Sequence, residues 1–232
     1  MLINPYRFGP VDPYFSSVSL LLHGDGTNGS TTIIDSSSSP KTVTAFGNAQ
    51  ISTAQSKFGS SSIYFDGSGD YLLIPNSAAF GFGTGDFTVE LWINPNASGS
   101  QVYARLLQCG DYPNGWQLVR GPIGGGTSNP ISVWVDFLGG SALRLGGGTI
   151  QNNQWSHVAM TRANGTVRIF VNGVIAASGT SSSDLGQHSV IIGSSSSGSE
   201  AINAYMNEIR ITKGVARYTA NFTPPTAPFP NQ

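Results

Sequence analysis

The side chains that could carry out hydrolysis are few in this chain. It has three glutamates, Glu90, Glu200 and Glu208, and no acidic residue lies two positions from any of them. Cleavage of a glycosidic bond with retention needs two carboxyl groups about 5–5.5 Å apart. Alternate residues of a strand supply that spacing, but Asp86 and Glu90 are four positions apart, or roughly 13 Å. We therefore predict no catalytic residues and a non-enzymatic protein.

A nucleophilic serine or cysteine is not indicated either. The strained G-x-S-x-G turn that presents a catalytic serine is missing. Cys109 is the single cysteine, and none of the three histidines forms a local signature with it. A small buried thiol in a strand is the expected environment of Cys109. We interpret His157, which lies on a predicted strand, as a packed structural histidine.

Aromatic and polar side chains suited to binding a sugar gather in the middle of the chain. Rings stack on the apolar faces of sugars, while amides and carboxylates bind their hydroxyl groups. The region 111–145 is therefore the predicted concave binding surface. Its candidate carbohydrate-binding residues are Tyr112, Asn114, Trp116, Trp134, Asp136 and Arg144. The alternative is that both tryptophans lie in the core.

Strands must position these candidates, because no segment keeps an apolar stripe of period 3.6 over about 11 residues. Phe87, Val89, Leu91 and Ile93 instead alternate with Thr88, Glu90 and Trp92, as in a strand. The alternation indicates an all-β protein, a two-sheet antiparallel β-sandwich. The predicted strands are Val18–Leu22, Ser61–Asp66, Tyr71–Ile74, Asp86–Asn94, Val102–Cys109, Trp116–Arg120, Ser132–Phe137, Ala142–Leu145, Trp155–Arg162, Thr166–Val171, Val174–Ala177, Ser189–Ile192 and Ala204–Thr212.

The best-defined strands surround two Asn-Gly dipeptides, at residues 164–165 and 172–173. Asn-Gly between alternating apolar residues is a strong hairpin signal, because both turn positions need positive φ. We therefore expect tight turns at both places, with strands running into and out of each.

Composition favours a folded domain with a neutral polar surface. Only 10% of the residues are charged, against a usual value of about 25%. Yet 39% are hydrophobic and 10% are aromatic, so a sizeable core is expected. With a net charge of −1 and no basic run, the sequence gives no support to nucleic-acid binding. No run approaches the ~18 apolar residues of a membrane-spanning helix, so membrane insertion is not expected.

The two ends of the chain differ from its middle. We expect an N-terminal docking arm at residues 1–16, a β-sandwich at 17–218 and a proline-rich C-terminal tail at 219–232. The arm has three prolines and the aromatic residues Tyr6, Phe8, Tyr14 and Phe15, which are candidate contacts with a partner or a neighbouring subunit of a homo-oligomer. The alternative is a strap lying on its own domain. The apolar run Val18–Leu22 is too short for a signal peptide, so we expect synthesis in a host cytoplasm.

Four blocks of sequence occur in a familiar order. They are YFDGSGDYLLIPNSAAFGFGTGDFTVELWINP at residues 64–95, the hairpin region 155–173, VIIG at 190–193 and YMNEIRITKGVARY at 205–218. Together they resemble laminin G-like domains of the concanavalin A-like lectin and glucanase superfamily. The resemblance covers roughly residues 17–223 and implies a concanavalin A-like jelly roll. Asn207 stands where the family often has an aspartate.

Many laminin G-like modules hold one Ca²⁺, so the resemblance also suggests a metal site. The loop GDGTNG at residues 24–29 offers a carboxylate, an amide and backbone carbonyls, the hard ligands that suit Ca²⁺. Asp25, Asp35 and Glu208 are the candidate ligands. An ordinary Asx-type turn is the alternative for this loop, and no other cofactor is expected.

The overall style of the sequence is similar to laminin G-like proteins from bacteriophage genomes. That resemblance implies a structural or adhesion protein of the virion, either a capsid decoration or a tail or fibre component. Its partners would be other virion proteins and, more weakly, cell-surface glycans. A free carbohydrate-binding lectin module and a glycoside hydrolase or depolymerase are the alternative functions.

Overall fold

The computed structural model describes residues 11–98, 102–110, 115–122, 132–138 and 143–232, with residues 132–134 and 138 described by their backbone alone. Short 3₁₀ turns aside, these residues form strands. In chain order the elements are η1 Phe15–Ser17, β1 Val18–Leu22, β2 Thr44–Phe46, β3 Gln50–Ser52, β4 Ser62–Asp66, β5 Tyr71–Ile74, η2 Ala78–Phe80, β6 Phe87–Pro95, β7 Ala104–Cys109, β8 Gly115–Arg120, β9 Ser132–Leu138, β10 Arg144–Thr149, β11 Ser156–Ala163, β12 Thr166–Val171, β13 Val174–Thr180, β14 Val190–Ile192 and β15 Asn203–Lys213.

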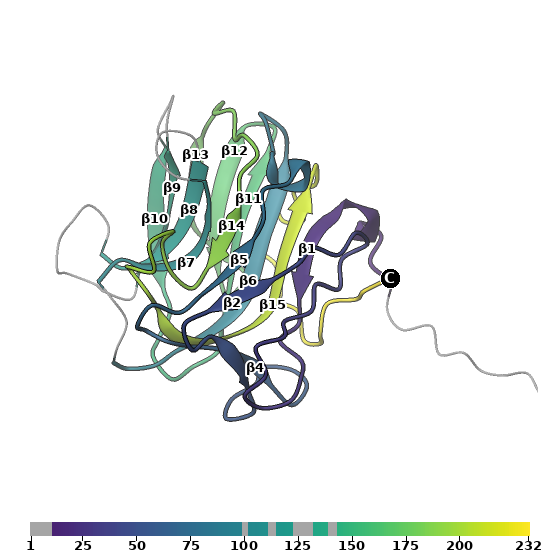
Figure 1. The fold of residues 1–232 in the computed structure, drawn as a ribbon. Coiled ribbons are helices and arrows are strands. Elements are labelled where there is room, and N and C mark those ends of the chain that lie inside the picture. The colour runs from purple at the N-terminus through teal and green to yellow at the C-terminus, as the bar shows by residue number, and fades with distance from the viewer. Residues whose placement is uncertain (1–10, 99–101, 111–114, 123–131, 139–142) are drawn as a thin grey trace, which may run out of the picture.

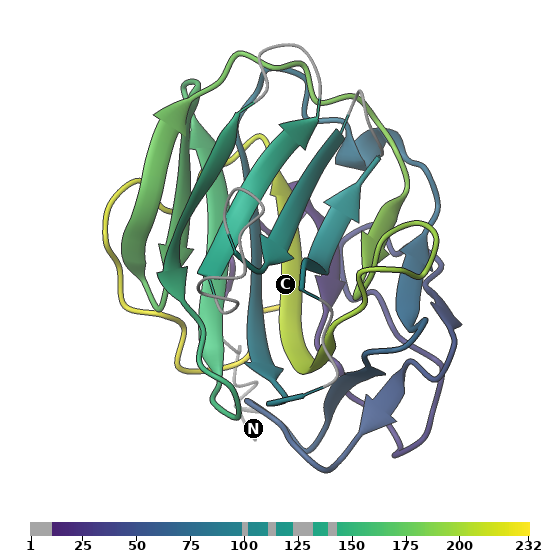
Figure 2. The ribbon, with the colours of Figure 1, turned by 90° about the vertical axis from the view of Figure 1, so that its left-hand side faces the viewer.

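The strands form two antiparallel sheets that lie face to face (Figure 1). The eight-stranded sheet has the order β13-β12-β11-β6-β15-β4-β3, with β1 also paired to β15. The seven-stranded sheet has the order β10-β9-β8-β7-β14-β5-β2. Figure 2 looks onto strands of the seven-stranded sheet, with β15 behind them. This architecture confirms the predicted all-β sandwich, and no helix of the described residues is long and apolar enough to cross a membrane.

The hydrophobic core lies between the two sheets. The alternating residues Phe87, Val89, Leu91 and Ile93 of β6 all point into it and are fully buried. Trp116 of β8 faces them from the other sheet. Because alternate residues of a strand share a face, the predicted alternation of β6 is confirmed, and the structure shows that its apolar face is the inner one.

Both Asn-Gly turns form as predicted. Asn164 and Gly165 have φ values of 47° and 77°, and Asn172 and Gly173 have values of 50° and 78°. The first turn joins β11 to β12 in continuous antiparallel register. The second joins β12 to β13, whose antiparallel register shifts between Ile169 and Phe170. Positive φ at both turn positions matches the right-handed twist of the flanking strands, so these residues fix the register at this edge of the sheet.

The chain's own ends cover the outer face of the eight-stranded sheet. Phe229 packs against Val18, Leu21 and Phe15, and the backbone N–H of Phe222 donates to the carbonyl of Gly173 (2.9 Å). Near the C-terminus, which lies beside β1 in Figure 1, the carbonyl of Gln232 accepts from the N–H of Asp12 (2.9 Å). Residues 219–232 are therefore a packed strap on the sheet.

Candidate functional site

Four polar side chains form a row across the outer face of the seven-stranded sheet. Gln108 of β7 is in register with Gln117 of β8, Gln117 with Asp136 of β9, and Asp136 with Arg144 of β10. Trp116 and Cys109, which flank this register, point into the core, so the four polar residues point the other way. We call Gln108, Gln117, Asp136 and Arg144 the polar row.

The carboxylate of Asp136 is the centre of the polar row. Its Oδ2 accepts from Nη2 of Arg144 (2.7 Å) and from Nε2 of Gln117 (3.3 Å). The Arg144 side chain is 51% exposed, whereas Gln117 is 5% exposed. The Oε1 atom of Gln117 is buried and has no hydrogen-bond partner among the described residues.

An aromatic pair lies on the same outer face, at the opposite edge of the sheet. Phe46 of β2 is opposite Tyr71 of β5 in register, and their rings stack with centroids 4.5 Å apart. Phe46 is 38% exposed. We call Phe46 and Tyr71 the aromatic pair, a platform of the kind on which the apolar face of a sugar can stack.

The polar row and the aromatic pair are far apart on one surface. β10 and β2 are separated by six strand spacings, which corresponds to about 29 Å between Arg144 and Phe46. A single sugar residue cannot contact both. The outer face of the seven-stranded sheet therefore has the chemistry to bind an extended ligand, with ring stacking at one end and charge-assisted hydrogen bonds at the other.

The structure places the predicted carbohydrate-binding residues in different environments. Asp136 and Arg144 do lie together. Trp116 is a core residue, 1% exposed and stacked on Phe82 with centroids 5.9 Å apart, so its assignment to the ligand surface is corrected. The backbone of Trp134 is in register with Val119 and Gly146. Tyr112 and Asn114 lie outside the described residues.

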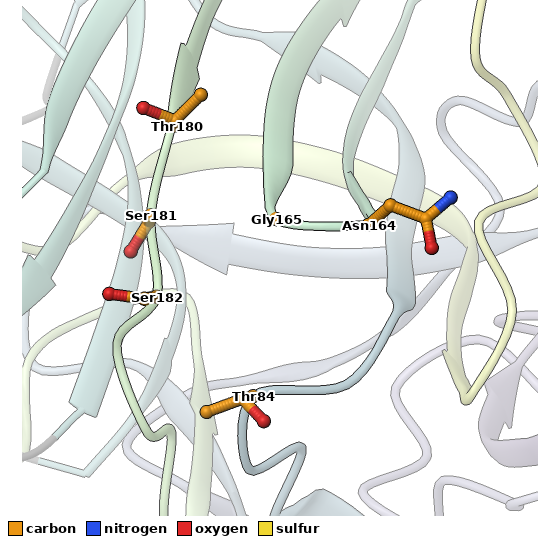
Figure 3. A pocket seen from close by; sticks show the side chains of 6 residues that line it. All are labelled: Thr84, Asn164, Gly165, Thr180, Ser181 and Ser182. Atoms are coloured by element: carbon orange, nitrogen blue, oxygen red, sulfur yellow. The ribbon is translucent and has the colours of Figure 1, made fainter.

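A pocket of about 580 Å³ lies at one end of the sandwich. Figure 3 shows its three walls: the stretch from Thr180, the last residue of β13, to Ser182, the turn of Asn164 and Gly165, and Thr84 on the loop before β6. We call it the hydroxyl pocket, because its lining side chains are neutral alcohols and one amide. The residues come from three separate segments, so sequence spacing gave no signal for this pocket.

The carboxylate of Glu90 is bound by cations and is not free to act as an acid. Its Oε1 accepts from Nη2 of Arg210 (2.8 Å), and its Oε2 from the hydroxyl of Tyr218 (2.8 Å). His157 is fully buried, as predicted, with Nε2 3.2 Å from Oε2 of Glu90. Burial alone would raise the pKa of Glu90, but the charge of Arg210 and the hydrogen bond of His157 outweigh it and lower the pKa to about 2.

The same network ties the N-terminal segment to the sheet. Asp12 binds Arg217 through both carboxylate oxygens, at 3.0 and 2.7 Å, and its Oδ2 lies 3.2 Å from Nη1 of Arg210. We call Asp12, Glu90, Arg210, Arg217 and Tyr218 the terminal network. Its two carboxylates and two guanidinium groups balance each other's charge, which is the condition for burying ions at tolerable cost.

One pair of acidic residues does share a turn. Asp70 is fully buried, and burial raises the pKa of its carboxyl group. Its two oxygens accept the backbone N–H groups of Asn48 and of Asp66. Asp70 therefore closes the β4–β5 connection and pins the β2–β3 turn to it. Because β4 and β5 belong to different sheets, this connection passes from one sheet to the other and is not a hairpin.

Cys109 is an inert core residue. It is fully buried, and burial raises the pKa of its thiol to about 12. Because the thiolate is the nucleophilic form, this thiol is almost entirely unreactive at neutral pH, as the sequence predicted for a small buried side chain.

The three predicted calcium ligands do not form a shared site. Asp35 accepts the backbone N–H groups of Leu21, Ser37 and Lys41, so both of its oxygens are used to organise its own loop. Glu208 binds Nδ1 of His23 (3.0 Å) and the N–H of Phe229 (2.8 Å). Across the described ranges, no group of three or more His, Cys, Asp and Glu side chains could hold a metal ion. These residues therefore do not fit a common Ca²⁺ site.

The docking candidates of the N-terminal arm are described in part. Phe15 packs on Phe229 and strand β1, so it is an internal contact of the sandwich. Tyr14 is 45% exposed, with the guanidinium of Arg217 5.4 Å from its ring centroid. Tyr6 and Phe8 lie outside the described residues.

Comparison with known families identifies the sandwich. The sequence model of the family described as the concanavalin A-like lectin/glucanases superfamily, in its laminin G form, matches residues 66–217. That range runs from the end of β4 to Arg217 of the terminal network. A search of curated protein sequences gives no significant match.

Solved structures share the fold at low sequence identity. The botulinum neurotoxin serotype G binding domain superposes with a TM-score of 0.63 at 12% identity, covering 86% of this chain and 48% of its own. The binding domain of Paraclostridial Mosquitocidal Protein 1 gives 0.66 at 14%, covering 88% and 50%. The botulinum neurotoxin DC binding domain in complex with SialylT gives 0.64 at 14%, covering 87% and 49%. The chain thus spans about half the length of these structures.

Proposed function

The chain belongs to the concanavalin A-like lectin/glucanases superfamily, and from that premise we propose that it is a non-enzymatic glycan-binding adhesion module. The ligand surface of this proposal is the outer face of the seven-stranded sheet. The ligand is an extended saccharide that contacts the polar row, the aromatic pair or both.

One observation carries the proposal: this face holds both kinds of group that saccharide recognition uses. The aromatic pair offers an exposed ring, and the polar row offers the half-exposed guanidinium of Arg144. The outer face of the other sheet is occupied by the chain's own ends. The hydroxyl pocket supplies a further neutral polar surface that fits sugar hydroxyls.

The non-enzymatic part of the proposal is supported by the use of the carboxylates. Glu90, Asp12 and Glu208 are buried and bound by cations, a histidine or backbone N–H groups. A glycosidase needs one carboxyl group as proton donor and a second one facing the same bond. Incubation of a bound oligosaccharide with the protein should release no new reducing ends, and steady release would instead favour a hydrolase.

We place this module on a virus particle, again as a proposal. Its support is the resemblance of the sequence to laminin G-like proteins of bacteriophage genomes and the position of Asp12 and Gln232, which are hydrogen bonded to each other beside the eight-stranded sheet. Attachment through that sheet would leave the seven-stranded sheet facing outward. Mass spectrometry of purified particles tests the location, and absence of the protein from them would contradict it.

The ligand surface is tested with a glycan array followed by titration calorimetry on the best ligand. Arg144→Ala should weaken binding by about tenfold, the typical effect of removing one charge-assisted hydrogen bond. Phe46→Ala should weaken it through loss of stacking. Arg168→Ala, on β12 of the other sheet, is the matched control and should bind as the unmodified chain does. Equal weakening by Arg144→Ala and Arg168→Ala would place the ligand elsewhere, and an array without any binding would contradict the glycan proposal.

A further inference from the structure

Two of the chain's three lysines meet in one pocket. Lys41, in the loop before β2, and Lys213, the last residue of β15, line a pocket of about 360 Å³. Six serines make up most of the remaining lining, from residues 16–19, 38–39 and 77. We call this the lysine pocket. In a chain with only 10% charged residues, the meeting of two lysines from distant segments requires an explanation.

In the described part of the chain, no acidic side chain lines the lysine pocket. Among the described residues, neither ammonium group has a carboxylate within ion-pair distance. By contrast, Arg105 forms an ion pair with Glu200, and Arg144 forms one with Asp136. Each lysine instead donates to a carbonyl: Lys41 to Ser39, and Lys213 to Ala78 (2.8 Å). An ammonium group has three N–H donors, so both retain donors for a ligand.

The loop that carries Lys41 is held in place by a buried carboxylate. Asp35 accepts the N–H groups of Ser37 and Lys41 and the hydroxyl of Ser37 (3.0 Å). This arrangement places Ser38, Ser39 and Lys41 at the pocket and directs the Asp35 carboxylate to the backbone. The pocket therefore has ammonium and hydroxyl donors on an ordered loop, facing the end of β15.

The cost of burying the positive charge of Lys41 is only partly compensated by its surroundings. Burial lowers the pKa of Lys41, and the Asp35 charge opposes that effect without cancelling it. A bound anion would favour the charged form of Lys41, because an opposite charge nearby raises the pKa of an amine.

We propose that the lysine pocket binds the oxyanion of an acidic saccharide, with Lys41 and Lys213 binding the carboxylate or sulfate oxygens and the serine hydroxyls binding the sugar hydroxyls. This inference rests on the proposed function in one respect: it takes the anionic group to be part of a saccharide. The pocket lies apart from the polar row, which belongs to the other sheet. Its volume suits one sugar residue with its charged group, which also fixes the orientation of a longer chain.

The test is an amide NMR titration of the full chain with three probes: inorganic sulfate, glucuronate and glucose. Glucuronate should shift the amide signals of Ser39 and Ser77 saturably, and it should bind at least about threefold more tightly than sulfate, a gain of under one charge-assisted bond. Glucose should cause no shift at these amides. Lys41→Gln/Lys213→Gln should weaken glucuronate binding at least about tenfold.

Lys57→Gln is the matched control, because Lys57 is the third lysine and its ammonium lies 4.0 Å from the Trp92 ring centroid. It should leave glucuronate binding unchanged. If Lys57→Gln weakened glucuronate binding equally, the attraction would be a nonspecific effect of positive charge, and the proposed site would be overturned. If sulfate bound as tightly as glucuronate, the sugar would add nothing to binding, and the proposal of a saccharide ligand would be overturned. Arg144→Ala should leave these shifts intact, so failure of the sheet-face proposal and failure of this one are distinguishable.

Discussion

At the scale of single residues, half of the protein's scarce acidic side chains are buried. Six of the twelve acidic residues are buried in the described part of the chain: Asp12, Asp35, Asp70, Glu90, Asp136 and Glu208. A buried carboxylate must be bound by cations or N–H groups, since desolvation is otherwise too costly. Apart from Asp136, which binds Gln117 and Arg144 on neighbouring strands, these residues hold loops and chain ends in place. The surface is therefore even less charged than the composition suggests.

Glu90 is the residue whose loss should cost most. Glu90→Gln would keep the shape of the side chain but leave Arg210 buried beside one fewer carboxylate. Breaking a buried ion pair in this way costs about 3–5 kcal/mol, measured as the free energy of unfolding in urea. Glu200→Gln is the control, because its pair with Arg105 is partly exposed and is worth less than about 1 kcal/mol. Similar losses in both variants would contradict the role given to Glu90.

At the scale of elements, sequence reasoning worked where a local pattern fixes the backbone. The Asn-Gly turns and the alternation of β6 are local, so both were predicted correctly. β2 and β3 were missed because each has three residues and leans on a neighbouring strand. β10 extends to Thr149 through Gly146, Gly147 and Gly148, and glycine carries no strand signal.

The packing of the C-terminal strap could not be read from its prolines. Its contacts are backbone and ring contacts with β12, β13 and the terminal network, such as the stacking of Phe222 on Tyr218 with centroids 3.6 Å apart. A run rich in proline is compatible with either a free tail or a docked strap. Burial against the sheet decides between them, and that depends on residues far away in the sequence.

Gly173 is where a turn and the strap meet. A Cβ atom at this position would lie 1.9 Å from the carbonyl oxygen of Phe222, whereas at Gly165 the nearest atom would be 3.6 Å away. Both glycines have similar positive φ, so Gly165→Ala measures the backbone strain alone, about 1–2 kcal/mol. Gly173→Ala should cost more and should speed hydrogen exchange at the Phe222 amide. Equal costs, with Phe222 still protected, would show that the strap is not held there.

At the scale of the whole molecule, the two outer faces have different uses. The eight-stranded sheet is covered by chain ends, while the seven-stranded sheet carries the polar row and the aromatic pair. Asp136 and Arg144 were predicted because they lie close in sequence. Gln108, Gln117, Phe46 and Tyr71 were missed, since only strand pairing brings them onto one face. Trp116 was misplaced because a strand pattern does not say which face is inside.

The fold as a whole should be most stable between about pH 4.5 and pH 6.5. The pKa of Glu90 is lowered from 4.5 to about 2, and that of Asp12 is lowered from 3.8. Their contribution to the stability of the fold is complete above their pKa values in the unfolded chain, and it is lost as pH falls through their pKa values in the folded protein. Asp70 acts in the opposite direction, because burial raises its pKa, but it lacks the two arginine partners that the terminal network supplies.

The alkaline side depends on His23. Burial lowers its pKa, but the hydrogen bond and charge of Glu208 outweigh that effect and raise the pKa above 6.5. The His23–Glu208 pair therefore stabilises the fold below pH 6.5, and this contribution is lost as pH rises through the folded pKa. Urea unfolding at about pH 2.5, 5.5 and 8.5 should give the largest free energy in the middle. Glu90→Gln should make the acid limb shallower, with the Asp12 contribution remaining, and leave the alkaline limb unchanged, whereas His23→Gln should make only the alkaline limb shallower. A limb whose slope is unchanged in its variant would assign that titration to other groups.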